Sequence, residues 1–190
     1  MARTKVSKAD FKKALEIGRP PNIKRLFPNS RALIVSGKVV DRAMIAKGKA
    51  VAMAANGRNQ FVIRGALMAA QRANAAVIIE IAKSEGGTKA YCAVNFWNIA
   101  MLVDNLCNEL GITIPVAVHA DHYGIKNEKD LAAAKVEIPT LFEAGMTSVA
   151  IDASFLPDDK LVSSVCSHRN RFPFSNHRPI HYFSTYDQGF

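Results

Sequence analysis

Four short, continuously apolar segments stand out in the middle of the chain. They read AVAMAA, AAVIIEIA, IPVAVHAD and TSVAIDAS and occupy residues 50–55, 75–82, 114–121 and 147–154. Strands that are covered on both faces have such uninterrupted runs, whereas strands with one solvated face alternate between apolar and polar residues. The pattern therefore predicts four buried strands of a parallel sheet.

Amphipathic helical patterns lie between these segments. Residues 60–74 and 95–111 repeat apolar side chains at three-to-four spacing, and Gly111 suits the end of the second helix. Residues 128–145 are helical in pattern on both sides of Pro139, which we expect to end or kink one segment, with Gly145 ending the other. Alternating strands and helices are typical of parallel βα units, which build either an open doubly wound sheet or a (β/α)8 TIM barrel.

The position of the polar residues favours the barrel. No GxGxxG motif follows the first strand, which argues against a dinucleotide-binding sheet. Each strand instead ends in side chains that can bind ligands or transfer protons, at the carboxyl end where barrel active sites are built. These are Asn56 and Asn59, the Ser-Glu-Gly-Gly of residues 84–87, His119, Asp121 and His122, and Asp152 and Ser154. Four units make about the first half of a barrel.

Composition narrows the class of protein. No apolar run approaches the roughly 20 residues that cross a bilayer, and the three cysteines have no CxxC spacing, so we expect a cytoplasmic protein without a membrane segment. The formal net charge is +9, and residues 1–49 hold thirteen Lys or Arg against three acids. Such a field attracts phosphorylated metabolites, nucleic acid or an acidic partner, or is only a solvated basic face. Nucleic acid is disfavoured because no aromatic-interleaved binding motif appears in this segment.

The His119-Ala120-Asp121-His122 stretch carries the strongest chemical signal. Imidazole is a good zinc ligand and an adjacent carboxylate can transfer protons, but a strand-end histidine beside a helix-capping aspartate is the plainer interpretation. The glycines of residues 84–87 suit either a phosphate or a simple turn. Asp152 suits either a metal ion or a helix cap, and Asn56 either a substrate contact or a turn.

Taken together, these stretches resemble a known family. IPVAVHADHYG followed by EAGMTSVAIDAS, with AANGRNQFVIRGALMAAQRANAAVII and SEGG upstream, is similar to class II, metal-dependent fructose-bisphosphate aldolases over residues 50–160. The resemblance implies that Asp121 is the catalytic, proton-transferring residue and that His122 is a metal ligand, with Asp152 near a second metal position. It also implies substrate or phosphate contacts from Asn56, Ser84 and Gly86, and a supporting role for His119.

The same resemblance implies an activity. Class II aldolases are lyases that use Zn2+, with a second divalent or a monovalent cation as a further option, to cleave fructose 1,6-bisphosphate reversibly into dihydroxyacetone phosphate and glyceraldehyde 3-phosphate in glycolysis and gluconeogenesis. We accordingly expect a phosphorylated sugar as substrate and a homo-oligomer. The alternatives are a non-catalytic phosphate-binding or regulatory module and a basic nucleic-acid-binding protein.

The sequence divides into three parts. A basic segment (1–49) precedes a partial aldolase-type barrel (50–160), and an atypical tail rich in histidine and aromatic residues (161–190) follows. We expect the barrel to be truncated after its fourth βα unit. The tail is interpreted as a frame-shifted or misspliced segment, with replacement metal ligands (His168, His177 and His181) and a basic–aromatic binding tail as the alternatives.

Overall fold

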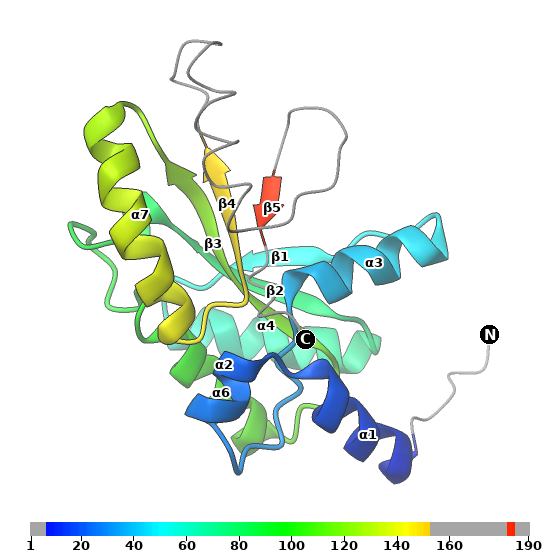
Figure 1. The fold of residues 1–190 in the computed structure, drawn as a ribbon. Coiled ribbons are helices and arrows are strands. Elements are labelled where there is room, and N and C mark those ends of the chain that lie inside the picture. Colours follow the sequence, from blue (N-terminus) through cyan, green and yellow to red (C-terminus); the bar gives the residue numbers. More distant parts are fainter. Residues whose placement is uncertain (1–6, 153–181, 185–190) are drawn as a thin grey trace.

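The computed structural model describes residues 7–152 and 182–184, which form one sheet with helices on both faces (Figure 1). The strands lie in the order β1 (Met53–Asn56), β2 (Val77–Ala82), β3 (Val116–Gly124), β4 (Ser148–Asp152) and β5 (Tyr182–Ser184). The first four are parallel, and β5 runs antiparallel to β4. All four predicted strands are therefore confirmed, in sequential order as barrel strands require.

Seven helices complete the described part of the chain. They are α1 (Lys8–Gly18), α2 (Pro21–Leu26), α3 (Gly37–Lys47), α4 (Gln60–Ala73), α5 (Lys83–Gly86), α6 (Ile99–Leu110) and α7 (Glu128–Glu143). None of them has the length and hydropathy that a bilayer-spanning helix needs. Gly111 ends α6 in the left-handed conformation with φ 63°, as its position in the sequence predicted.

The expectation that Pro139 ends a helical segment was wrong, because α7 continues through it as one helix, whereas a kink at Pro139 stays a prediction. The side chain of Asn127 accepts hydrogen bonds from the backbone N–H groups of Lys129 and Asp130 at the start of α7. The buried face of the helix, which includes Ile138 and Leu141, packs into the core on either side of the proline. Pro139 itself is exposed, so water can satisfy the carbonyl that its missing N–H leaves without a partner.

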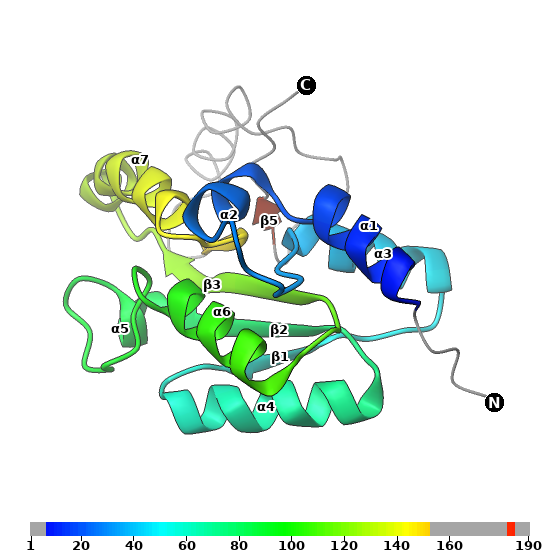
Figure 2. The same cartoon turned by 90° about the horizontal axis from the view of Figure 1, so that it is seen from below.

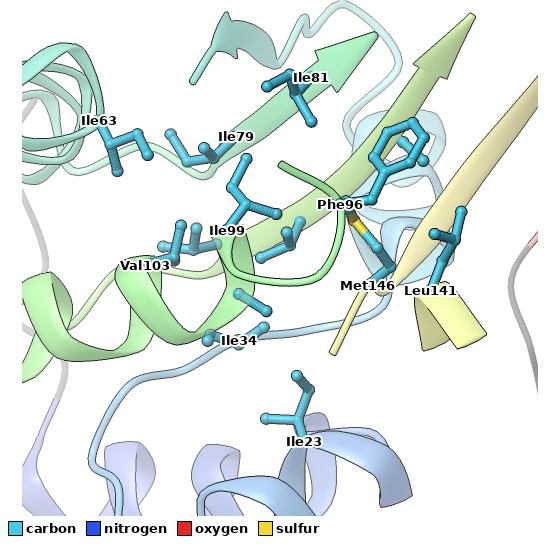
Figure 3. Close-up of a cluster of buried hydrophobic side chains, with 14 of the residues drawn as sticks. Ile23, Ile34, Ile63, Ile79, Ile81, Phe96, Ile99, Val103, Leu141 and Met146 are labelled. Atoms are coloured by element: carbon cyan, nitrogen blue, oxygen red, sulfur yellow. The ribbon is translucent and has the colours of Figure 1, made fainter. Parts of the chain in front are cut away.

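The main core lies between the outer face of the sheet and helices α4, α6 and α7 (Figure 3). Alternate residues of each strand point to this face, as the two-residue period of a strand requires. On β2 these residues are Val77, Ile79 and Ile81, all completely buried, and they meet Ile63 and Leu67 of α4. Burial of each such side chain stabilises the fold by about 1.5–3 kcal/mol.

Helices α1 and α3 cover the opposite, inner face of the sheet. Figure 2 shows α1 and α3 on one side of the strands and α4 and α6 on the other. Ile78 and Ala117 from the inner face form a second cluster with Leu33, Val35 and Val40. This cluster lies toward the amino ends of the strands, so the polar residues at their carboxyl ends remain outside it.

A polar network attaches the segment between α2 and α3 to the rest of the fold. The buried Arg19 guanidinium donates hydrogen bonds to the carbonyl oxygens of Ile23, Phe27 and Ser30. The Ser30 hydroxyl donates to Asp104 of α6 at 2.6 Å. The N-terminal basic residues are thus joined to a packed part of the fold, while the division of the chain at residue 49 stays a prediction.

Candidate active site

The register of the four parallel strands aligns one row of polar residues on the inner face of the sheet. Asn56 of β1 lies beside Glu80 of β2, Glu80 beside His119 of β3, and His119 beside Ser148 of β4. Paired residues of neighbouring parallel strands point to the same side, so these four side chains share one face. Thr147 fixes the register of β4, because its hydroxyl accepts a hydrogen bond from the Val118 N–H at 2.9 Å and donates to the Val118 carbonyl at 3.1 Å.

His119 is almost completely buried within this row, with 2% of its surface exposed. Its Nδ1 lies 2.8 Å from the Ser148 hydroxyl oxygen. Burial lowers the pKa of His119 to about 4, against the opposing effect of the Ser148 hydrogen bond. The imidazole is therefore neutral near pH 7, which is the form that binds metal ions.

A β-bulge follows His119 and changes the direction of the next two side chains. Between Ala120 and Tyr123, strand β3 has one residue more than the facing segment of β4. His122 takes up this extra length in the left-handed conformation with φ 43°, which is uncommon for a residue other than glycine. Asp121 and His122 can therefore both lie near the inner side of the sheet, although they are consecutive in the chain.

Asp121, His122 and Asp152 meet at the carboxyl ends of β3 and β4. His122 Nε2 lies 3.5 Å from Asp121 Oδ2, and His122 Nδ1 lies 3.9 Å from Asp152 Oδ2. The His122 side chain is 59% exposed, so it is accessible to a ligand that approaches from solvent. Imidazole and carboxylate groups in this arrangement suit a divalent transition-metal ion.

Glu80 is a fourth ionisable residue of this region, and the motif analysis missed it. The pKa of Glu80 is raised to about 7, chiefly by burial and also by the nearby Asp121 carboxylate, while His122 opposes the shift. One donor atom each from Glu80, His119 and Asp121 lies within 4.8 Å of the other two. The sequence feature that could have indicated Glu80 is its position as the single acidic residue inside the apolar run AAVIIEIA.

Asn56 joins a separate polar cluster at the end of β2. Its amide Nδ2 donates to Glu85 Oε2 at 2.6 Å, and the Arg58 guanidinium forms an ion pair with the same carboxylate. Burial alone would raise the pKa of Glu85, but the hydrogen bonds from Asn56, the Ala82 N–H and Arg58 lower it overall. Asn56 thus holds Glu85 in this structure.

Ser84 and Gly86 lie in the one-turn helix α5 rather than in an extended loop. Ser84 is exposed, whereas Gly86 is buried against β2. A Cβ atom at Gly86 would come within 2.9 Å of Ile81 Cδ1, so close packing is one reason for glycine there. A role of either residue in phosphate binding stays a prediction.

Lys83 lies against the end of β3. Its ammonium group is 4.0 Å from the centroid of the Tyr123 ring and donates to the Gly124 carbonyl at 3.3 Å. The Tyr123 hydroxyl in turn donates to Glu137 of α7 at 2.9 Å. These contacts connect α5, β3 and α7 just behind the bulge.

The structure therefore brings together three residues that the sequence predicted, Asp121, His122 and Asp152. His119 precedes Asp121 by two residues on β3. Asn56 shares the inner row but contacts Glu85, and Ser84 lies on a different element. The tail of residues 161–190 lies outside the described residues except for β5, as do His168, His177 and His181.

Comparison with known proteins identifies the family to which this chain belongs. The sequence model of the family "Fructose-bisphosphate aldolase class-II" matches residues 38–166, which is more than half of the chain. This chain belongs to the class II fructose-bisphosphate aldolase family. The family consists of lyases and is metal-dependent in general, and the resemblance inferred from residues 50–160 is confirmed.

Curated aldolases match only part of their own length. Fructose-bisphosphate aldolase of Staphylococcus aureus (strain Mu50 / ATCC 700699) is 40% identical over 98 residues, which are 52% of this chain and 30% of that protein. The enzyme of Geobacillus stearothermophilus is 38% identical over 96 residues, which are 50% of this chain and 29% of that protein. The chain therefore spans about a third of the curated aldolases that it matches.

A solved aldolase structure supports the fold. Fructose-bisphosphate aldolase from Campylobacter jejuni has a TM-score of 0.52 at 24% identity, covering 72% of this chain and 43% of that chain. The predicted fold class, a partial (β/α)8 TIM barrel, is confirmed by this likeness together with the four parallel strands.

Proposed function

We propose that this chain carries the Asp121–His122 part of a class II aldolase active site, which cleaves fructose 1,6-bisphosphate reversibly into dihydroxyacetone phosphate and glyceraldehyde 3-phosphate. The observation that carries the proposal is the bulge at the end of β3, which puts a carboxylate and an imidazole next to each other opposite Asp152. Membership of the family supplies the reaction class.

His122 and Asp152 are the residues that would hold the metal ion, which we propose to be Zn2+. Their donor set fits the ion, because zinc accepts imidazole nitrogen and carboxylate oxygen at about 2 Å. Both side chains are partly exposed, so an ion can reach them from solvent. A divalent ion bound there supplies Lewis-acid stabilisation of negative charge on the substrate carbonyl oxygen.

Asp121 is the residue that we propose to move the proton. In cleavage its carboxylate removes the proton of the C4 hydroxyl, and in condensation it returns that proton. The Asp121 side chain is 25% exposed, so it borders both the row of polar residues and solvent. His119 is a positioning residue in this scheme, because its ring lies two residues before Asp121 on the same strand face.

We further propose that Asn56, Ser84 and Gly86 contact the phosphorylated sugar. Support comes from the position of Asn56 at the end of β1 and of Ser84 and Gly86 just after β2, at the carboxyl ends of the strands where barrel enzymes bind substrates. The net charge of +9 favours the approach of an anionic substrate. A cytoplasmic location, a homo-oligomeric state and the lack of nucleic-acid binding stay predictions.

Activity and metal content measured on one sample test this function. The purified chain with added Zn2+ should release dihydroxyacetone phosphate from fructose 1,6-bisphosphate in a coupled assay. Asp121→Asn should lose the cleavage while the chain still binds metal through His122. His122→Ala should lose one equivalent of bound metal, and an unchanged metal content in this variant would refute the ligand assignment. Absence of cleavage by the metal-loaded chain would refute autonomous catalysis.

A further inference from the structure

We propose that Glu80, His119 and Asp121 form a second divalent-cation site on the inner face of the sheet, separate from the position at His122 and Asp152. One donor atom from each of the three residues lies within 4.8 Å of the others. The proposal does not depend on aldolase activity, because it rests on the geometry of β2 and β3 alone.

The strand register explains why these three side chains converge. Glu80 and His119 are paired residues of the neighbouring parallel strands β2 and β3, and Asp121 follows His119 by two positions, before the bulge displaces His122. All three therefore point to the inner face. They come from the neighbouring strands β2 and β3, whose backbone is a more rigid support than a loop.

His119 is oriented as a metal-binding histidine is. The Ser148 hydroxyl lies 2.8 Å from Nδ1, and when this hydroxyl accepts the Nδ1 proton the lone pair is on Nε2. Metal-ligating histidines usually have such a partner on the second ring nitrogen, which fixes the tautomer and the ring orientation. Ser148 is only 1% exposed, so this partner is held by packing as well.

The Glu80 carboxylate has no compensating partner among residues 7–152 and 182–184. No hydrogen bond and no ion pair to it is found there, although the residue is half-buried and lies near a second carboxylate. Two neighbouring carboxylates in a poorly solvated position repel each other, and removing an unpaired charge from water is costly. A bound cation offsets both effects.

The chemistry of the donors selects the kind of ion. One imidazole nitrogen and two carboxylate oxygens suit Zn2+ or a similar first-row ion, rather than Ca2+ or Mg2+, which take oxygen ligands. Around Zn2+ the donors lie about 2 Å from the metal and therefore about 3–4 Å apart. Rotation of the Glu80 and Asp121 side chains can close the remaining distance, with solvent completing the coordination.

Zinc binding to the full chain, measured by isothermal titration calorimetry after chelator treatment, tests the proposal. We expect two zinc equivalents for the unaltered chain, one each for Glu80→Gln and His122→Ala, and none for the double variant. Ser148→Ala should weaken one site by on the order of 10–100-fold, as loss of an orienting partner does. Glu109→Gln, which removes an exposed carboxylate from the opposite side of the sheet, is the control and should bind as the unaltered chain does.

The variants separate this proposal from the proposed function. If Glu80→Gln retains the stoichiometry and affinity of the unaltered chain, the Glu80 site does not exist. If the unaltered chain binds one zinc equivalent and either substitution, Glu80→Gln or His122→Ala, abolishes it, there is a single site and the proposal is overturned. Loss of one equivalent in Glu80→Gln, with the other lost in His122→Ala, supports it. Glutamine has nearly the shape of glutamate, and far-ultraviolet circular dichroism should show that the variant is folded.

Discussion

Replacement of Gly145 by alanine should disrupt the turn that leads from α7 into β4. Gly145 has φ +104°, which L residues rarely adopt, and a Cβ atom at this position would lie 2.6 Å from the Cβ of Ala100 on α6. Backbone strain of this kind costs about 1–3 kcal/mol. Overpacking adds about 1–3 kcal/mol, so the free energy of unfolding should fall by about 2–6 kcal/mol.

Gly111 is the matched control for this change. It also has a positive φ, +63°, but a Cβ atom there has nothing within 4 Å. Gly111→Ala should therefore lower the free energy of unfolding only by the energy of the left-handed conformation, about 1–2 kcal/mol. The comparison isolates the steric contribution, because both substitutions add the same single methyl group.

Urea unfolding followed by circular dichroism measures the two variants. A domain of this size has a free energy of unfolding of about 5–15 kcal/mol, so Gly145→Ala should move the midpoint strongly or leave a fraction of the chain unfolded. Equal midpoints for Gly145→Ala and Gly111→Ala would refute the reasoning, since they would mean that α6 and the turn do not approach as closely as described.

Three further changes test other parts of the site. Gly37→Ala should lower the free energy of unfolding by about 1–3 kcal/mol in urea titrations, because its Cβ atom would lie 2.6 Å from Ser148 Oγ. In chelator-treated protein, the stability of the unaltered chain relative to that of Glu80→Gln should fall as the pH rises from 4.5 to about 7, because the raised pKa of Glu80 makes the folded state the better proton acceptor. The lowered pKa of His119 has the opposite effect on stability but is common to both proteins, so the difference isolates Glu80. Solvent screening reduces this relative loss to about 1 kcal/mol, and thermal unfolding of the two proteins across this pH range measures it. Glu85→Gln should lower the free energy of unfolding in urea titrations by about 1.5–3 kcal/mol, because the hydrogen bond from Asn56 loses its charged acceptor. An unchanged unfolding midpoint would contradict a stabilising role of this hydrogen bond.

The strands were predictable because a buried parallel strand needs a continuous apolar run. The run AAVIIEIA predicted β2 within two residues, and β4 was recognised in the same way. The end of a helix expected at Pro139 does not occur, because the local preference of proline competes with the packing of Ile138 and Leu141 on either side of it. The sequence around a proline does not show whether its freed carbonyl faces water.

The candidate site was only partly predictable. The His-Ala-Asp-His pattern identified the end of β3, but alternation along a strand places Asp121 and His122 on opposite faces. Only the pairing with β4 shows the extra residue that changes this. Glu80 was overlooked because its neighbours His119 and Asp121 come from another strand, and their proximity depends on the register between the two.

The bulge on β3 also shifts the phase of the strand. Val116, Val118 and Ala120 contribute to the outer core at every second position, and after the bulge Tyr123 and Ile125 resume that contribution at odd positions. A chain shortened by His122 alone would therefore restore an uninterrupted alternation, with the same apolar residues still facing the helices. His122, the residue with the most direct candidate role in metal binding, is thus not needed for the pairing of β3 with β4. The sequence of this strand therefore meets two independent requirements, one for the site and one for the fold.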